Sequence, residues 1–128
     1  MKRTIEQQRY MVAKWIMGWE RYRFACEDWW AEPERPNAGM TRVLGPPCYK
    51  WHPEADREQA MQVAEVIRQK GYSYQIYAYS KDAISAYRHQ YCFLLRDRPT
   101  VFEWADTLEE AVFSVALMVA EMLEKEGV

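Results

Sequence analysis

The residues of this chain that could do chemistry are aromatic rings interleaved with cations. Planar rings can stack on a nucleobase, and a guanidinium can hold a phosphate in two-point contact, so this mixture suits a nucleotide. Rings and arginines at such density are also typical of surfaces that contact another protein. The residues that we predict to bind a ligand are Trp19, Arg21, Arg23, Tyr77, Tyr79, Arg88 and Arg96.

The sequence does not indicate a catalytic constellation. His52 and His89 are the two histidines, and no zinc-protease, serine-hydrolase or phosphate-loop motif accompanies them. Cys92 follows His89 by three positions, which on a regular strand places the two side chains on opposite faces. Carboxylates gather near predicted helix starts, where negative charge stabilises a helix without any further role. We therefore predict no catalytic residue, no metal site and no cofactor.

Composition narrows the class of protein. The 128 residues are 49% hydrophobic and carry a net charge of −2. This is enough for one domain with its own core, and the mild acidity disfavours a general nucleic-acid binder. No apolar run reaches the roughly 18 residues of a membrane span, and the opening residues lack the apolar segment of a signal peptide. The three cysteines are widely spaced, so we expect reduced thiols and a cytoplasmic location.

Aromatic residues are the unusual part of the composition. They make up 15% of the chain, including six Trp and nine Tyr. So many large rings exceed what a small core requires, and we expect some of them on a surface that binds something. For the same reason we expect a homo-oligomer, because a single layered domain of this size cannot easily bury them all.

Three helices are predicted, over residues 4–19, 56–70 and about 108–124. The last one begins with a capping box, in which Thr107 and Glu110 satisfy each other's backbone N–H groups. Its apolar stripe is wider than a half-exposed surface helix needs. We therefore expect this helix to lie flat on a sheet.

Strands are predicted at residues 20–26, 48–51, 72–80, 87–96 and 101–104. The centre of the fourth, Tyr91 to Leu95, is apolar on both faces and so requires cover on both sides. Residues 27–47 are rich in Pro and Gly, which predicts a long irregular loop.

The fold class predicted from these elements is α+β, in the order α-β-β-α-β-β-β-α. It is a single domain over residues 1–128, an α-β-α sandwich with three helices around a mainly antiparallel sheet of about four to five strands.

Three segments, in order along the chain, resemble the phage ABA sandwich domain family. Residues 12–19 (VAKWIMGW) look like its opening helix, and residues 54–57 (EADR) leading into 60–66 (AMQVAEV) are similar to its middle helix. Residues 105–111 (ADTLEEA) are similar to the start of its last helix. The resemblance implies an α-β-α sandwich and a phage or prophage origin, with the host-cell cytoplasm as the place of action. It carries over no catalytic residues.

Three functions follow as hypotheses. The first is a non-enzymatic phage accessory protein that binds a host protein through an aromatic surface. The second is a small-ligand binder, for example a sponge that sequesters a nucleotide signal of host immunity. The third, a small hydrolase, is disfavoured by the missing constellation. A ligand binder should show a concave pocket lined by Arg and Tyr, and a partner-binding protein should show a broad aromatic patch.

Overall fold

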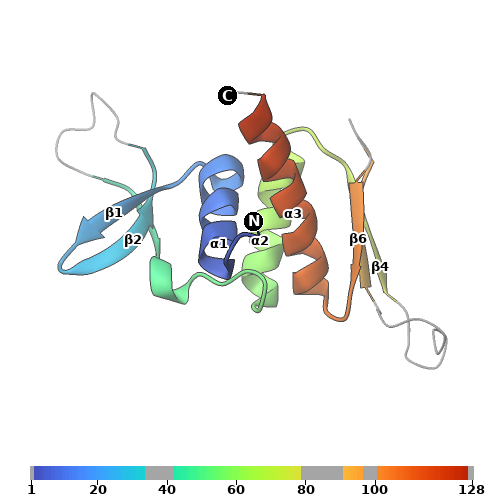
Figure 1. The fold of residues 1–128 in the computed structure, drawn as a ribbon, viewed down its shortest axis with the longest axis horizontal. Helices are drawn as coiled ribbons and strands as arrows, with labels where there is room; N and C mark the ends of the chain where they lie inside the picture. Colours follow the sequence, from blue (N-terminus) through green and yellow to red (C-terminus); the bar gives the residue numbers. More distant parts are fainter. Residues whose placement is uncertain (1, 34–41, 79–90, 97–100, 127–128) are drawn as a thin grey trace.

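The computed structural model describes residues 2–33, 42–78, 91–96 and 101–126. Its helices form a central layer, and one three-stranded antiparallel sheet lies at each end of that layer (Figure 1). The helices are α1 (Ile5–Val12), α2 (Arg57–Gln69) and α3 (Leu108–Lys125), and a π-helical segment, η1 (Ala13–Met17), continues α1. The first sheet contains β1 (Glu20–Phe24), β2 (Glu27–Ala31) and β3 (Leu44–Pro47), and the second contains β4 (Tyr74–Ala78), β5 (Tyr91–Leu95) and β6 (Val101–Ala105).

Each helix begins where a short polar side chain caps it. The Thr4 hydroxyl accepts a hydrogen bond from the Gln7 backbone N–H, and the Gln7 side chain accepts one from the Thr4 N–H, which completes a capping box. Asp56 caps α2 by accepting from the N–H of Gln59. Thr107 caps α3 by accepting from the N–H of Glu110, at 3.2 Å. The predicted helix starts are therefore confirmed, and local sequence explains them.

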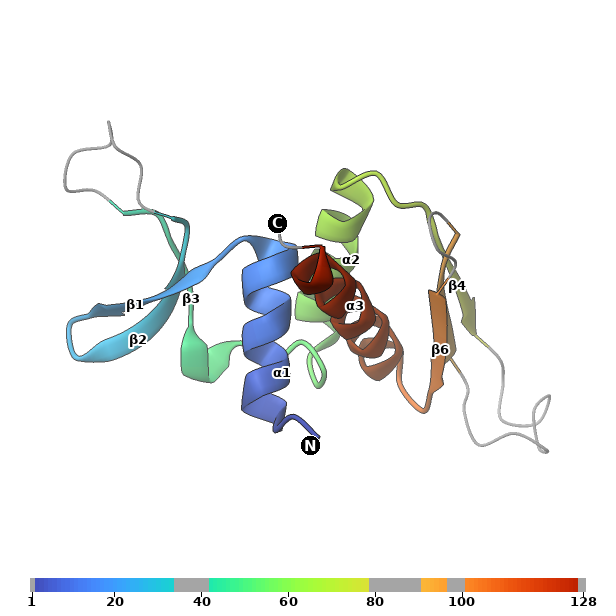
Figure 2. The same cartoon turned by 45° about the horizontal axis from the view of Figure 1, so that its top comes forward.

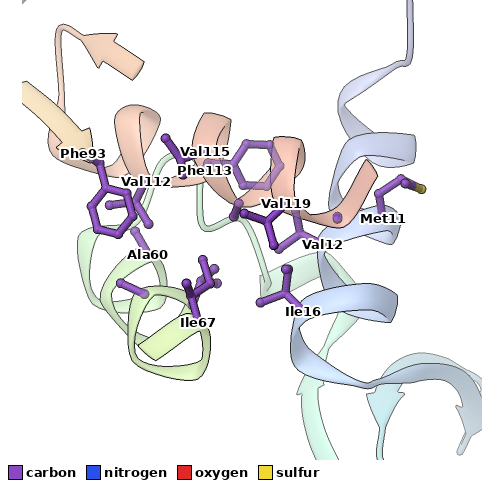
Figure 3. Close-up of a cluster of buried hydrophobic side chains, with 14 of the residues drawn as sticks. Met11, Val12, Ile16, Ala60, Ile67, Phe93, Val112, Phe113, Val115 and Val119 are labelled. Atoms are coloured by element: carbon purple, nitrogen blue, oxygen red, sulfur yellow. The ribbon is translucent and has the colours of Figure 1, made fainter. Parts of the chain in front are cut away.

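Helix α3 is the core of the molecule. Val112, Val115 and Val119 are completely buried, and α3 contacts α2, α1 and the strands β5 and β6. Phe93 of β5 reaches into this cluster from the sheet, whereas Ile16 of η1 enters it from the other side (Figure 3). The prediction that the last helix lies flat on a sheet is confirmed. A helix that is apolar nearly all round is stable only when neighbours cover it on several sides.

The fold class is α+β and the strands are antiparallel, as predicted. The element order agrees roughly with the prediction, since three strands rather than two precede α2 and three follow it before α3. The prediction of one sheet between two helical layers is wrong, because the structure has two sheets with the helices between them. The physical reason is that α3 has too much apolar surface for one sheet to cover, so helices and a sheet surround it.

The predicted irregular loop over residues 27–47 also needs correction, since it contains β2 and β3. The turn between β1 and β2 places Ala25 and Cys26 at positive φ, which a hairpin requires but which the sequence does not mark with Gly or Asn. Pro46 and Pro47 fit β3 because it is an edge strand, where a missing N–H is tolerated. Residues 34–41 lie outside the described part of the chain.

The predicted strand at residues 48–51 is instead a short 3₁₀ turn, η2 (Cys48–Lys50), closed by a hydrogen bond from the Trp51 N–H to the Cys48 carbonyl. The three strands of the second sheet agree with prediction in their described parts. The predicted ends of two of them, residues 79–80 and 87–90, lie outside the described residues.

Two phenylalanines on neighbouring strands can test which face of the second sheet packs against α3. Phe93 is 0% exposed and Phe102 is 54% exposed. We expect Phe93→Ala to lower the free energy of unfolding by about 3–5 kcal/mol, since it leaves a cavity in the core. Phe102→Ala should change it by no more than about 1 kcal/mol. Urea denaturation followed by circular dichroism measures both, and equal losses for the two variants would contradict this arrangement.

Candidate binding surfaces

The structure divides the predicted ligand residues between the two sheets. Trp19, Arg21 and Arg23 lie at the first sheet, whereas Tyr77 and Arg96 lie at the second. The helical layer separates these sheets (Figures 1 and 2), so a single protomer does not gather the two groups into one site. Tyr79 and Arg88 lie outside the described residues.

Arg21 and Arg23 share a face of β1 but have different surroundings. The Arg21 guanidinium lies 5.8 Å from the centre of the Tyr10 ring and 5.6 Å from that of Trp30, within cation–π range of both. Arg23 forms an exposed ion pair with Asp28 at 3.4 Å, and its side chain is 68% exposed. Arg21 is therefore packed against rings of α1 and β2, whereas Arg23 lies in solvent.

Trp19 belongs to a cluster of indoles that joins the first sheet to the helices. Its ring meets Trp51 edge-on at a centroid distance of 5.4 Å, and Trp51 meets Trp30 in the same way at 6.0 Å. Gly45 of β3 lies against the Trp19 ring, and a Cβ there would come within 3.3 Å of it. A side chain at position 45 would also approach the Trp30 carbonyl at 3.2 Å. The glycine allows this close approach, and Trp19 is held in place.

Arg21 also lines a cavity of about 380 Å³ between α1, the β1–β2 hairpin and η2. Arg9 lies in the same cavity, but its guanidinium binds both carboxylate oxygens of Glu54, and this hydrogen bonding raises the pKa of Arg9 further. Among the described residues, the carboxylates that line the cavity are those of Glu6, Glu27 and Asp28. Acidic groups outnumber the cations, so the cavity would repel a phosphate more than attract it.

The second sheet carries a surface that we call the outer aromatic face, on the side away from α3. Strand register places Tyr77, Cys92 and Trp104 in one row, and Gln75, Leu94 and Phe102 in the next. Trp104 is 37% exposed and Tyr77 is 38% exposed, while Cys92 between them is only 4% exposed. No described helix or strand lies over this face (Figures 1 and 2).

Gln75 brings two of the predicted residues together at the edge of this face. Its side-chain oxygen accepts hydrogen bonds from the Tyr77 hydroxyl at 2.8 Å and from the Arg96 guanidinium at 2.7 and 2.9 Å. Sequence reasoning missed Gln75, Phe102 and Trp104. The alternation of Phe102 and Trp104 in the last strand was the signal that could have found the outer aromatic face.

The described residues contain neither the ligand cluster of a metal site nor a helix that could span a membrane. Among them, no three His, Cys, Asp or Glu side chains lie together in a way that could hold a metal ion. Within the same part of the chain, no helix has the length and apolar character to cross a bilayer.

The three thiols should differ in reactivity, because their surroundings differ. Cys26 is exposed at the hairpin turn, whereas burial raises the pKa of the Cys48 and Cys92 thiols. A raised pKa keeps a thiol protonated to higher pH, and only the thiolate reacts. We expect alkylation by iodoacetamide at pH 8 in the order Cys26, Cys48, Cys92, and the two slower rates should continue to rise at higher pH. Peptide mass spectrometry measures all three, and fastest labelling of Cys92 would contradict the burial of that strand.

Comparison with known proteins identifies a shared fold. No family model matches the chain, and no curated protein matches it in sequence. Among solved structures, the chain is similar to a phage protein from Bacillus cereus ATCC 14579, with a TM-score of 0.58 and 17% sequence identity. The match covers 94% of this chain and 91% of that one. It supports the resemblance to a phage protein at the level of the fold, and the more specific ABA sandwich family stays a prediction.

Proposed function

We propose that this chain is a non-enzymatic accessory protein of a phage or prophage that binds a host protein on the outer aromatic face. The observation that supports this proposal is a sheet face with exposed Phe102, Trp104 and Tyr77 that no described helix or strand covers. Tryptophan and tyrosine dominate the binding energy of protein interfaces. The fold shared with a phage protein supports the origin, and the free thiols agree with a reducing host cytoplasm.

The occupant that fits this face is an amphipathic helix. The axes of the outer strands of a three-stranded sheet lie about 10 Å apart, which matches the roughly 10–12 Å diameter of a helix with its side chains. Strands of five residues make the face about 17 Å long, too small for the ~800 Å² that each partner buries in a standard interface. A single helix therefore fits better than a folded domain or a second copy of this chain.

The chemistry of the face supports an apolar partner. Its side chains Cys92 and Leu94 on the central strand and Trp104 on β6 carry no charge at neutral pH, and Arg96 at the edge is bonded to Gln75. A phosphate would find little to bind there. The inner face of the same sheet already packs against α3, so a helix on the outer face would give this sheet the two-sided cover that the sequence of β5 demands.

A photo-crosslinking experiment tests the proposal. Tyr77 is replaced by p-benzoylphenylalanine in a host strain that carries the phage or prophage, and irradiated adducts are mapped by peptide mass spectrometry. We expect one host protein, joined through the apolar side of a helix. Phe102→Asp should abolish the adduct without changing the melting temperature, because it places a charge in the contact while the side chain remains exposed.

Tyr49 provides the matched control position, since it is 67% exposed and belongs to the other end of the molecule. The same photoreactive residue at position 49 should give no adduct with that host protein. Adducts with a second copy of the chain, with non-helical segments, or with no protein at all would overturn the proposal.

A further inference from the structure

We infer that a second cavity, beside α1 and η1, binds a planar anionic ligand: an aromatic ring system that carries one phosphate or carboxylate group. The cavity has a volume of about 470 Å³, within the range of small-molecule sites. It lies at the first sheet, away from the outer aromatic face, and so goes beyond the proposed partner binding. Its lining includes Tyr10, Lys14, Trp15, Trp19, Glu20 and Pro33.

The rings that line this cavity could stack on a planar ligand. Tyr10 and Trp15 come from the continuous helix formed by α1 and η1, and Trp19 follows directly after Gly18 ends that helix. Contact with Trp51 and with the backbone of Gly45 holds Trp19 in place before any ligand binds. Stacking of a ring on such side chains contributes about 1–3 kcal/mol per base in single-stranded nucleic-acid complexes.

The charges at this cavity favour an anion. The Lys14 ammonium lies 5.1 Å from the centre of the Trp15 ring and 5.9 Å from that of Tyr10, and no described carboxylate pairs with it. Glu20 is the one carboxylate among the described residues that line this cavity, and Arg42 neutralises it through an ion pair.

The cavity that Arg21 lines has a less favourable charge for an anion, since three of the described residues that line it are carboxylates. A planar anionic ligand should therefore bind more tightly in the cavity that Lys14 lines than in the cavity that Arg21 lines. Because Lys14 is the one cation among the described residues of this lining, the geometry points to a ligand with one anionic group.

Adenosine 5′-monophosphate and guanosine 5′-monophosphate are suitable probes, with adenosine and inorganic phosphate as the two halves of the ligand. Tryptophan fluorescence and the melting temperature report binding, because the cavity contains two of the six indoles. We expect a nucleotide to quench fluorescence and raise the melting temperature, and each half alone to bind at least about tenfold more weakly, a difference of about 1.4 kcal/mol. Equal binding of inorganic phosphate would overturn the inference, as would no saturable response to either nucleotide up to about 1 mM.

Lys14→Gln is the decisive variant, since the side chain is exposed and its loss leaves the core intact. We expect it to weaken nucleotide binding about tenfold or more with an unchanged melting temperature of the free protein. Lys125→Gln, at the exposed end of α3, is the matched control and should bind as the unmodified protein does.

Undiminished binding by the Lys14 variant would overturn the inference. Phe102→Asp should leave nucleotide binding unchanged, so failure here and failure of the proposed partner binding are distinguishable.

Discussion

The burial of helix α3 is the constraint on which the rest of the structure depends. Its residues Val112, Val115 and Val119 have no contact with water, and neither do Ala116 and Ala120 on adjoining sides. Because the apolar surface runs nearly around the helix, one neighbour cannot cover it. Helices α1 and α2 and the second sheet surround it instead, and this arrangement leaves that sheet with one face covered by α3 and one face that no described helix or strand covers. The open aromatic surface is thus a direct consequence of how the core is built.

The first sheet is attached to this core by indoles rather than by aliphatic side chains. Trp30 and Trp51 are almost fully buried and meet edge to face, an arrangement that the quadrupoles of the rings favour. This packing has a free-energy cost, because some indole N–H groups are buried without a hydrogen-bond acceptor in the described structure. They are those of Trp15, Trp29, Trp30 and Trp51. Each such group costs about 1–3 kcal/mol. Burial of the large ring surfaces must offset this cost, so the indoles fix the hairpin by shape rather than by hydrogen bonds.

The separation of the two sheets by helices gives the molecule two chemically different ends. The rings at the first sheet are accompanied by cations, since Lys14 and Arg21, which both follow Tyr10 in sequence, lie within reach of its ring. On the outer aromatic face of the second sheet, the rings surround the uncharged Cys92 and Leu94, and the guanidinium of Arg96 at its edge is bonded to Gln75. Aromatic residues with cations suit a charged small molecule, whereas aromatic residues without them suit an apolar protein segment. A binding event at one end need not involve the other, and each can be tested alone.

The sequence by itself determined the positions of the helices and of most of the strands. It also indicated that β5, which is apolar on both faces, must be covered on both sides. The capping residues Thr4, Asp56 and Thr107 and the apolar spacing that follows them act over three or four residues, so they can be interpreted without the fold. The sequence did not determine how many sheets form.

The strands β2 and β3 could not be predicted from local sequence. The hairpin turn at Ala25 and Cys26 lacks the Gly or Asn that usually marks such a turn, and β3 contains prolines, which usually argue against a strand. Only the tertiary structure decided which rings meet which cations. Gln75 joins Tyr77 to Arg96, and Arg21 reaches Tyr10 across eleven positions of sequence, through strand register and helix packing. Such contacts depend on surfaces that are complementary across the whole chain, and local patterns carry no information about that complementarity.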